Sequence, residues 1–135
     1  LADDRFPVLL VRVPAADWVE PMRCVVGPCL FGLGWRVRDG EAGRGSWGER
    51  GRREVVVFAR DGSSREHRPE RGNEVVGAAV VAGIPLLGVA DDPAKTLPRD
   101  LLQAVDREIL VGPLDAGALR LVIEVVTGEV PPLST

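Results

Sequence analysis

The sequence is poor in the side chains that most often carry chemistry in proteins. It has one histidine and two cysteines, and Lys95 is its only lysine, so that arginines supply the rest of its 17 basic residues. The single histidine, His67, cannot provide the partners of a catalytic triad, and a solvated loop position explains it more simply. Cys24 and Cys29 are too few for a disulfide framework and lack the spacing of zinc ligands, which favours buried thiols. These shortages argue against a free-standing enzyme.

A strong net charge and a long apolar run are also missing. The net charge is only -3, so the composition gives no electrostatic reason to expect nucleic acid as a partner. The best apolar stretch, residues 75–90, is interrupted by Pro85 and three glycines and falls short of the ~20 residues that span a bilayer. The opening Leu1-Ala2-Asp3-Asp4 is acidic rather than basic, unlike a secretory leader. We therefore expect a cytoplasmic protein with no membrane partner.

What the sequence does contain is an alternation of strand-like and helix-like segments. Strand-like runs occupy residues 6–13, 54–59, 84–89 and 108–111, and helical patterns occupy residues 18–26, 73–82, 98–105 and 115–127. Such alternation requires crossover connections, and hence a mostly parallel sheet covered by helices. The prediction is an α/β fold with an open, mostly parallel, Rossmann-like sheet of about five strands. The length suits a single domain over residues 1–128, followed by a linker at 129–135 to a downstream domain.

The glycine-rich stretch after the first helical pattern is harder to interpret. Val19, Met22 and Val26 recur at helical spacing, and Gly27-Pro28 is expected to end that helix. A short strand over residues 30–37 is then followed by a flexible loop, rich in glycine and arginine, over residues 38–53.

That loop contains a glycine motif that suggests nucleotide binding by spacing alone. Gly43-Arg44-Gly45-Ser46-Trp47-Gly48 has the spacing of a dinucleotide-binding loop, but a strand rather than a helix follows it. As a phosphate-binding P-loop it also fails, because Glu49-Arg50 stands where a lysine and a hydroxyl side chain are needed. We do not expect autonomous nucleotide hydrolysis.

Acidic residues follow two of the predicted strands. Asp61 comes after the strand at 54–59, and Asp91 and Asp92 come after the strand at 84–89. Ligands of open α/β sheets bind beyond the carboxyl ends of the strands, where paired carboxylates could hold magnesium. Roles in turns and helix caps explain these aspartates more simply. Trp35 in the predicted short strand, and Arg44 and Trp47 in the loop, are further candidates, as exposed anchors for a partner.

Several segments together resemble the region ahead of the ATPase module in bacterial AAA-type (AAA+) ATPases. They are Val55-Val56-Val57-Phe58, Arg71-Gly72-Asn73, Gly83-Ile84-Pro85-Leu86-Leu87-Gly88-Val89-Ala90-Asp91-Asp92-Pro93, Leu97-Pro98-Arg99-Asp100-Leu101, Ala104-Val105-Asp106 and Pro113-Leu114-Asp115. The resemblance spans residues 6–128, approximately, and is strongest from Glu54 onward. It carries no catalytic signature onto any residue of this chain.

The resemblance implies a non-catalytic N-terminal domain for regulation, substrate recognition or assembly. ATP and Mg²⁺ would then be cofactors of the downstream ATPase module, with none in this segment. The implied partners are that module and a protein substrate or adaptor, within a homo-oligomer of the full-length protein. The run from Leu97 to Asp106 also resembles part of an ATPase core, which leaves open a degenerate P-loop-like fold.

One alternative from a different functional class remains. A small-ligand or nucleotide-binding domain would use the loops at the carboxyl ends of the strands, with Asp61, Asp91, Asp92 and Asp115 as its candidate side chains.

Overall fold

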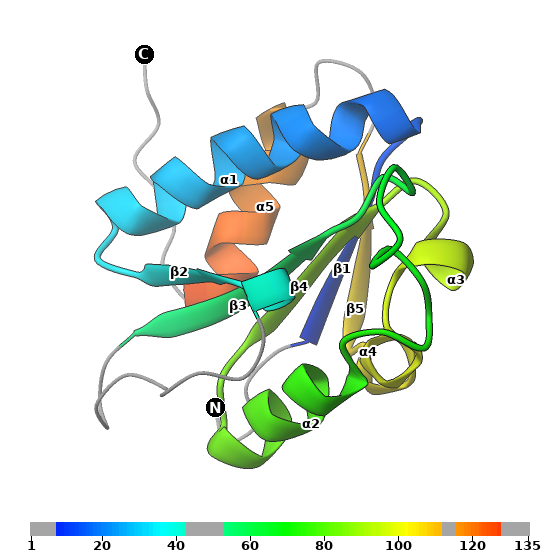
Figure 1. The fold of residues 1–135 in the computed structure, drawn as a ribbon. Coiled ribbons are helices and arrows are strands. Elements are labelled where there is room, and N and C mark those ends of the chain that lie inside the picture. Colours follow the sequence, from blue (N-terminus) through cyan, green and yellow to red (C-terminus); the bar gives the residue numbers. More distant parts are fainter. Residues whose placement is uncertain (1–7, 43–52, 112–115, 128–135) are drawn as a thin grey trace.

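The protein folds around one five-stranded sheet in which every neighbouring pair of strands is parallel. Figure 1 shows the computed structural model, which describes residues 8–42, 53–111 and 116–127. The strands are β1 (Val8–Arg12), β2 (Arg36–Asp39), β3 (Glu54–Ala59), β4 (Leu86–Ala90) and β5 (Arg107–Leu110), in the spatial order β2-β3-β4-β1-β5. The predicted α/β class and parallel sheet are confirmed, and the arrangement is consistent with a Rossmann-like fold.

Helices cover both faces of the sheet (Figure 1). One face carries α1 (Val19–Gly32) and α5 (Ala116–Thr127), and the other carries α2 (Asn73–Ala82) and α4 (Arg99–Ala104). Three short helices complete the described chain: η1 (Ala16–Trp18), η2 (Gly40–Ala42) and α3 (Pro93–Thr96). Within the described ranges, no helix combines the length and the apolar character needed to cross a bilayer.

The central strands are apolar on both faces because each face is packed under helices. In β1, Leu9 and Val11 belong to the core beneath α1 and α5, whereas Val8 and Leu10 belong to the core beneath α2 and α4. All five residues of β4 are buried. Successive side chains of a strand point to opposite faces, so these continuous apolar runs fill two cores at once.

Helix α1 differs from the sequence-based expectation, because it continues through Gly27-Pro28 and ends at Gly32. An interior proline removes one helical hydrogen bond and destabilises a helix by about 3 kcal/mol. Val26 and Leu30 are 1% and 0% exposed, and burial of each such side chain contributes about 1.5–3 kcal/mol. The packing of this face onto the sheet therefore outweighs the local break. The stop predicted at Gly27-Pro28 was wrong.

The strand predicted over residues 30–37 is displaced for the same reason. Residues 30–32 are helical, and β2 begins only at Arg36. Arg38 and Asp39 lie in β2 and residues 40–42 form η2, so the predicted flexible loop over 38–53 begins too early. Residues 43–52 of that loop lie outside the described residues.

The second half of the chain follows the prediction closely. Helix α2 matches its predicted range of residues 73–82, and α5 begins one residue after the predicted start. Strand β4 begins two residues later than expected and β5 one residue earlier. Helix α3 was not predicted, because four residues are too few to show a helical period. The predicted linker at 129–135 and Asp115 are outside the described residues.

Candidate functional site

Arg60, the residue directly after β3, holds the carboxyl edge of the sheet together. Its Nε and Nη2 donate to the two carboxylate oxygens of Glu41 at 2.7 and 3.0 Å. Its Nη1 donates to the carbonyl oxygens of Arg68, Arg71 and Thr96 at 2.9, 3.1 and 2.9 Å. The residue is 0% exposed, and one buried guanidinium thus joins η2, the loop over residues 60–72 and the end of α3. The Arg60 side chain therefore occupies the edge of the sheet at which other α/β proteins bind a ligand.

Two glycines allow this packing. The Arg60 guanidinium lies 5.1 Å from the centre of the Phe58 ring. A Cβ at Gly72, whose φ is +89°, would lie 2.9 Å from Nη2 of Arg60, and a Cβ at Gly40 would lie 2.6 Å from the Phe58 ring. Both positions therefore require the close approach that only glycine permits. Sequence reasoning missed Arg60, because among so many arginines nothing distinguishes it except its place at the end of a buried strand.

Asp61 and His67 stabilise the loop that follows. Asp61 Oδ1 accepts hydrogen bonds from the Ser63 hydroxyl at 2.6 Å and the Ser63 amide at 2.9 Å, and these bonds lower the pKa of Asp61 below its ordinary value. His67 Nδ1 accepts the Gly62 amide at 3.0 Å and lies 3.2 Å from Asp61 Oδ1. His67 lies in a loop, as expected, but its side chain is only 12% exposed and is therefore less solvated than the sequence suggests.

Asp91 and Asp92 do not converge with Asp61 on a ligand. The backbone carbonyl of Asp92 accepts the amide of Lys95 at 3.0 Å and the Thr96 hydroxyl at 3.2 Å, which shapes the start of α3. Its carboxylate lies 3.8 Å from Lys95 Nζ, and Asp91 is half-buried. Across residues 8–42, 53–111 and 116–127, no group of three or more His, Cys, Asp or Glu side chains is placed to hold a metal ion.

The tryptophan candidates are placed differently from the sequence-based expectation. Trp35 is 8% exposed and packs into the core beneath α1 and α5, so its expected exposure was wrong. Its indole N–H has no hydrogen-bond partner within the described part of the chain. Trp47 and Arg44 lie outside the described residues. Of the three proposed partner anchors, the structure therefore places only Trp35, and it is internal.

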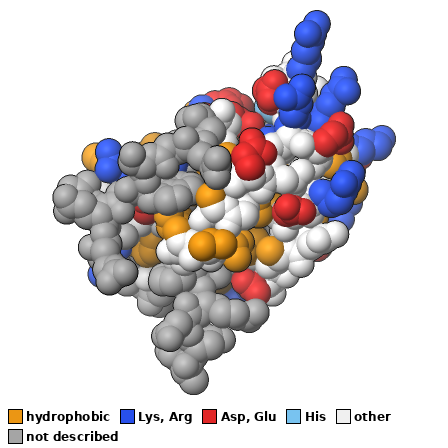
Figure 2. All heavy atoms as spheres, turned by 60° about the horizontal axis from the view of Figure 1, so that its bottom comes forward, with side chains coloured by type: hydrophobic (Ala, Val, Ile, Leu, Met, Phe, Trp, Pro, Cys, Tyr) orange, Lys and Arg blue, Asp and Glu red, His pale blue; other side chains and the backbone are white. Residues whose placement is uncertain are grey.

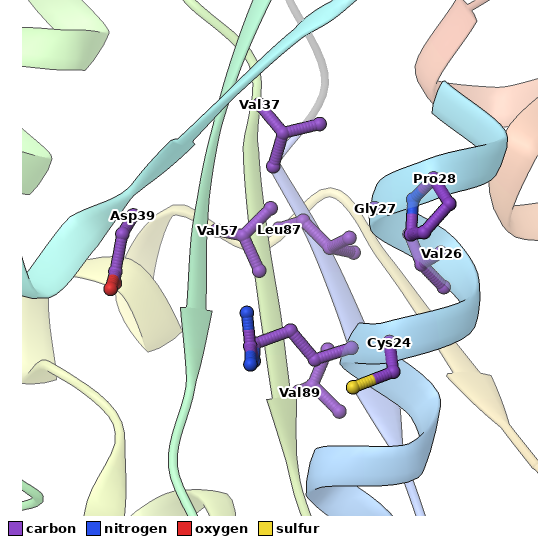
Figure 3. A pocket seen from close by; sticks show the side chains of 10 residues that line it. Cys24, Val26, Gly27, Pro28, Val37, Asp39, Val57, Leu87 and Val89 are labelled. Carbon is purple, nitrogen blue, oxygen red and sulfur yellow. The ribbon is translucent and has the colours of Figure 1, made fainter. Parts of the chain in front are cut away.

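A pocket of about 320 Å³ lies between α1 and strands β2, β3 and β4 (Figure 3). In Figure 3, Cys24 and Gly27 on α1 face Val57 and Leu87 across this space. The complete lining is Arg23, Cys24, Val26, Gly27, Pro28, Val37, Asp39, Val57, Leu87 and Val89. The pocket is a site that sequence reasoning did not find, because its walls come from four separate elements and it depends on the unpredicted second half of α1.

Two polar residues of this pocket, Arg23 and Cys24, interact with Glu20, one turn earlier in α1. Arg23 Nε donates to both carboxylate oxygens of Glu20 at 3.1 Å, and Nη2 of Arg23 contacts the same group. This pairing lowers the pKa of Glu20 and raises the pKa of Arg23. The Cys24 thiol donates to Oε2 of Glu20 at a distance of 3.7 Å. Cys24 and Cys29 are both exposed, contrary to the buried thiols expected from the sequence.

The outward side of α1 is apolar and solvent-exposed. No charged residue occurs between Arg23 and Arg36, although much of α1 lies at the surface. We call its exposed residues the α1 outer face: Cys24, Val25, Pro28, Cys29, Phe31 and Gly32. Phe31 is 75% exposed and Val25 is 45% exposed.

The opposite side of the molecule exposes apolar residues as well. Val80 and Val81 of α2 are 51% and 90% exposed. Figure 2, which brings the α2 side forward, shows hydrophobic side chains in the middle of that view and charged side chains gathered towards one side.

Comparisons of the chain with protein-family models, with curated proteins and with solved structures find no match. The geometry defines the fold class, an α/β protein with a five-stranded parallel sheet flanked by helices. The similarity to AAA+ ATPases rests on the sequence segments alone and stays a prediction.

Proposed function

We propose that this chain is a non-catalytic recognition or assembly domain of a bacterial AAA+ ATPase. The observation that carries the proposal is the α1 outer face. A surface helix normally presents polar side chains to water, whereas this helix presents Val25 and Phe31 there and has no charge after Arg23. Exposed apolar surface of this kind is typical of sites that contact another protein.

The use of polar groups at the carboxyl edge of the sheet supports a binding role over a catalytic one. Arg60 is fully engaged in joining η2, the 60–72 loop and α3, and Asp61 and His67 close a turn. A general base or nucleophile needs a partner and room for a substrate. In this arrangement the polar side chains stabilise the scaffold that presents the helices.

The partner that we propose for the α1 outer face is the ATPase module of the same polypeptide. The test compares Phe31→Gln with Val81→Gln in the full-length parent protein and in the isolated domain. Both changes replace an exposed apolar side chain on a helix, one on the α1 outer face and one on α2 across the sheet. Glutamine keeps helix propensity, so neither variant is expected to lose thermal stability.

The expected result is a loss of binding for Phe31→Gln alone, measured by titrating the separately purified ATPase module onto the domain. A well-packed aromatic residue at an interface contributes about 2 kcal/mol or more, which corresponds to a loss of at least about tenfold in affinity. Equal affinity of Phe31→Gln and the unaltered domain would overturn the proposal. The absence of a Gly-x-x-x-x-Gly-Lys-Thr/Ser motif from the full-length polypeptide would contradict it without any assay.

A further inference from the structure

The pocket between α1 and the sheet is walled by aliphatic side chains (Figure 3). Val37, Val57 and Leu87 line it from the sheet, and Val26 lines it from α1. Val57 and Leu87 are 5% and 0% exposed, so this wall of the pocket belongs to the core beneath α1 and α5. A water molecule is held firmly only where it has about 2–4 polar partners. Aliphatic walls hold water poorly, and an apolar group that displaces such water gains affinity.

Gly27 keeps space open beside the middle of α1. It lines the pocket, and a Cβ built there meets no atom within 4 Å, although the helix packs onto the sheet. Glycine in a helix interior costs about 0.5–1 kcal/mol relative to alanine, and here no neighbouring atom requires it. The space beside the Gly27 backbone can therefore take atoms of a ligand without displacing a neighbour.

The polar side chains of the pocket already have partners in the protein. Arg23 donates to both carboxylate oxygens of Glu20, and the Cys24 thiol donates to the same group. Asp39 accepts the Glu41 amide at 2.9 Å, is exposed to solvent and attracts Arg23 electrostatically. In Figure 3, Asp39 also lies apart from the labelled residues that face α1. Among the described lining residues, a charged ligand therefore meets no buried ionised group of opposite sign.

The volume of the pocket sets the size of the ligand. It is about 320 Å³, at the lower end of the range of about 300–1,000 Å³ that is typical of small-molecule sites. An apolar cavity of about 150 Å³ is large enough to bind benzene. The pocket beneath α1 therefore has room for one ring that carries a short side arm.

We propose that this pocket binds a small, uncharged and mainly apolar molecule of about one ring in size. Its apolar body lies between Val57 and Leu87 on the sheet and Gly27 on α1, and its polar group stays at the open side. Burial of apolar surface supplies the affinity, at about 25 cal/mol per Å². A charged relative gains no buried ion pair to offset the loss of its hydration. The proposal does not depend on the domain being part of an ATPase.

The probe is 2-phenylethanol, titrated to millimolar concentration at neutral pH and followed by backbone amide NMR. It is expected to shift the resonances of Gly27, Val57 and Leu87, and to bind at least about tenfold more tightly than ethanol, which lacks the ring. The cation 2-phenylethylamine and the anion 3-phenylpropanoate are expected to bind no more tightly than the alcohol. Absence of 2-phenylethanol binding at these concentrations, or tighter binding of either ion, overturns the proposal.

The two cysteines of α1 locate the bound molecule in the unaltered protein. Both thiols are exposed, but Cys24 lines the pocket and Cys29 is not among its lining residues. At twice its dissociation constant, 2-phenylethanol occupies the pocket about two-thirds of the time, so alkylation of Cys24 by iodoacetamide is expected to slow about threefold. The rate at Cys29 is the internal control and is expected to stay unchanged. Peptide mass spectrometry measures both rates, and an unchanged rate at Cys24 refutes the assignment.

A pair of glycine variants tests the same site. Gly27→Leu places a side chain in the open space beside α1 and is expected to abolish binding of 2-phenylethanol. Gly77→Leu is the matched control, since Gly77 is also mid-helix with nothing within 4 Å of a Cβ and is not among the lining residues. Undiminished binding by Gly27→Leu, with its fold intact by NMR, contradicts the proposal. The alkylation of Cys24 needs no variant, so it decides the question even where Gly27→Leu fails to fold.

Discussion

At the scale of single residues, Arg60 shows how one charged side chain can order several loops. A buried guanidinium is tolerated only when its charge is neutralised and its donors are paired. Glu41 provides the charge, and three backbone carbonyls take the remaining bonds. The loops joined in this way are distant in sequence, so their positions depend on one another through this side chain.

Replacement of Arg60 by methionine is expected to destabilise the protein by about 3–5 kcal/mol, because the Glu41 carboxylate and the buried carbonyls lose their donors. The measurement is urea denaturation at neutral pH. Arg12→Met is the control: Arg12 pairs with Glu108 at 3.7 Å on the surface, with about half of its side chain exposed, and its loss is expected to be about 0–1 kcal/mol. Similar losses for the two variants would show that the Arg60 contacts do not order the edge.

The hydrogen bonds from Ser63 to Asp61 predict a specific dependence on pH. Ser63→Ala removes the hydroxyl donor and is expected to raise the pKa of Asp61 towards its ordinary value of 3.8. Because the folded pKa lies below the unfolded one, the bond stabilises the protein above about pH 4, and this stabilisation is lost as the pH falls through the folded pKa. Carboxyl ¹³C titration checks the pKa, with Ser64→Ala as control. An unchanged pKa in Ser63→Ala would contradict the assignment.

At the scale of elements, the sequence predicts the bounds of a helix or strand well where the local residue pattern and the tertiary packing favour the same structure. Helix α2 and strand β3 have strong local signals, a helical run after Gly72 and a β-branched run from Glu54, and both were predicted within their bounds. Helix α1 was cut short in the prediction because Gly27-Pro28 is a local stop signal, and only the burial of Val26 and Leu30 shows why the helix continues. Tertiary packing, which is invisible in a local pattern, decides such cases.

Gly77 within α2 and Gly83 directly after α2 test opposite effects of the same substitution. Gly77 is exposed, and a Cβ there meets nothing within 4 Å, so Gly77→Ala is expected to stabilise the protein by about 0.5–1 kcal/mol. Gly83 ends α2 with φ +75°, and Gly83→Ala is expected to destabilise it by about 1 kcal/mol because alanine is strained in that conformation. Urea denaturation of both variants measures the two signs. A loss of stability in Gly77→Ala would indicate that the exposed side of α2 is less open than described.

At the scale of the whole molecule, the fold class could be predicted but the pocket could not. The alternation of elements indicates a parallel sheet, yet it does not specify which strands become neighbours. The pocket brings Arg23 of α1 beside Val57 of β3 and Leu87 of β4, because α1 crosses from β1 to β2 over β3 and β4. Trp35 gives the converse case, because a tryptophan beside a glycine-rich loop suggests exposure, whereas the turn after α1 places it in the core.

The strand order has a consequence for how the protein is made. Strand β1 leaves the ribosome before the other four strands, but its neighbours are β4 and β5, with Val8 opposite Leu86 and Leu9 opposite Arg107. During synthesis this apolar strand stays unpaired on both sides until β4 and β5 have emerged. Nascent chains that end before residue 86 are therefore expected to lack cooperative unfolding and to depend on chaperones. Full-length chains should fold slowly, since their sheet is closed by contacts between distant segments.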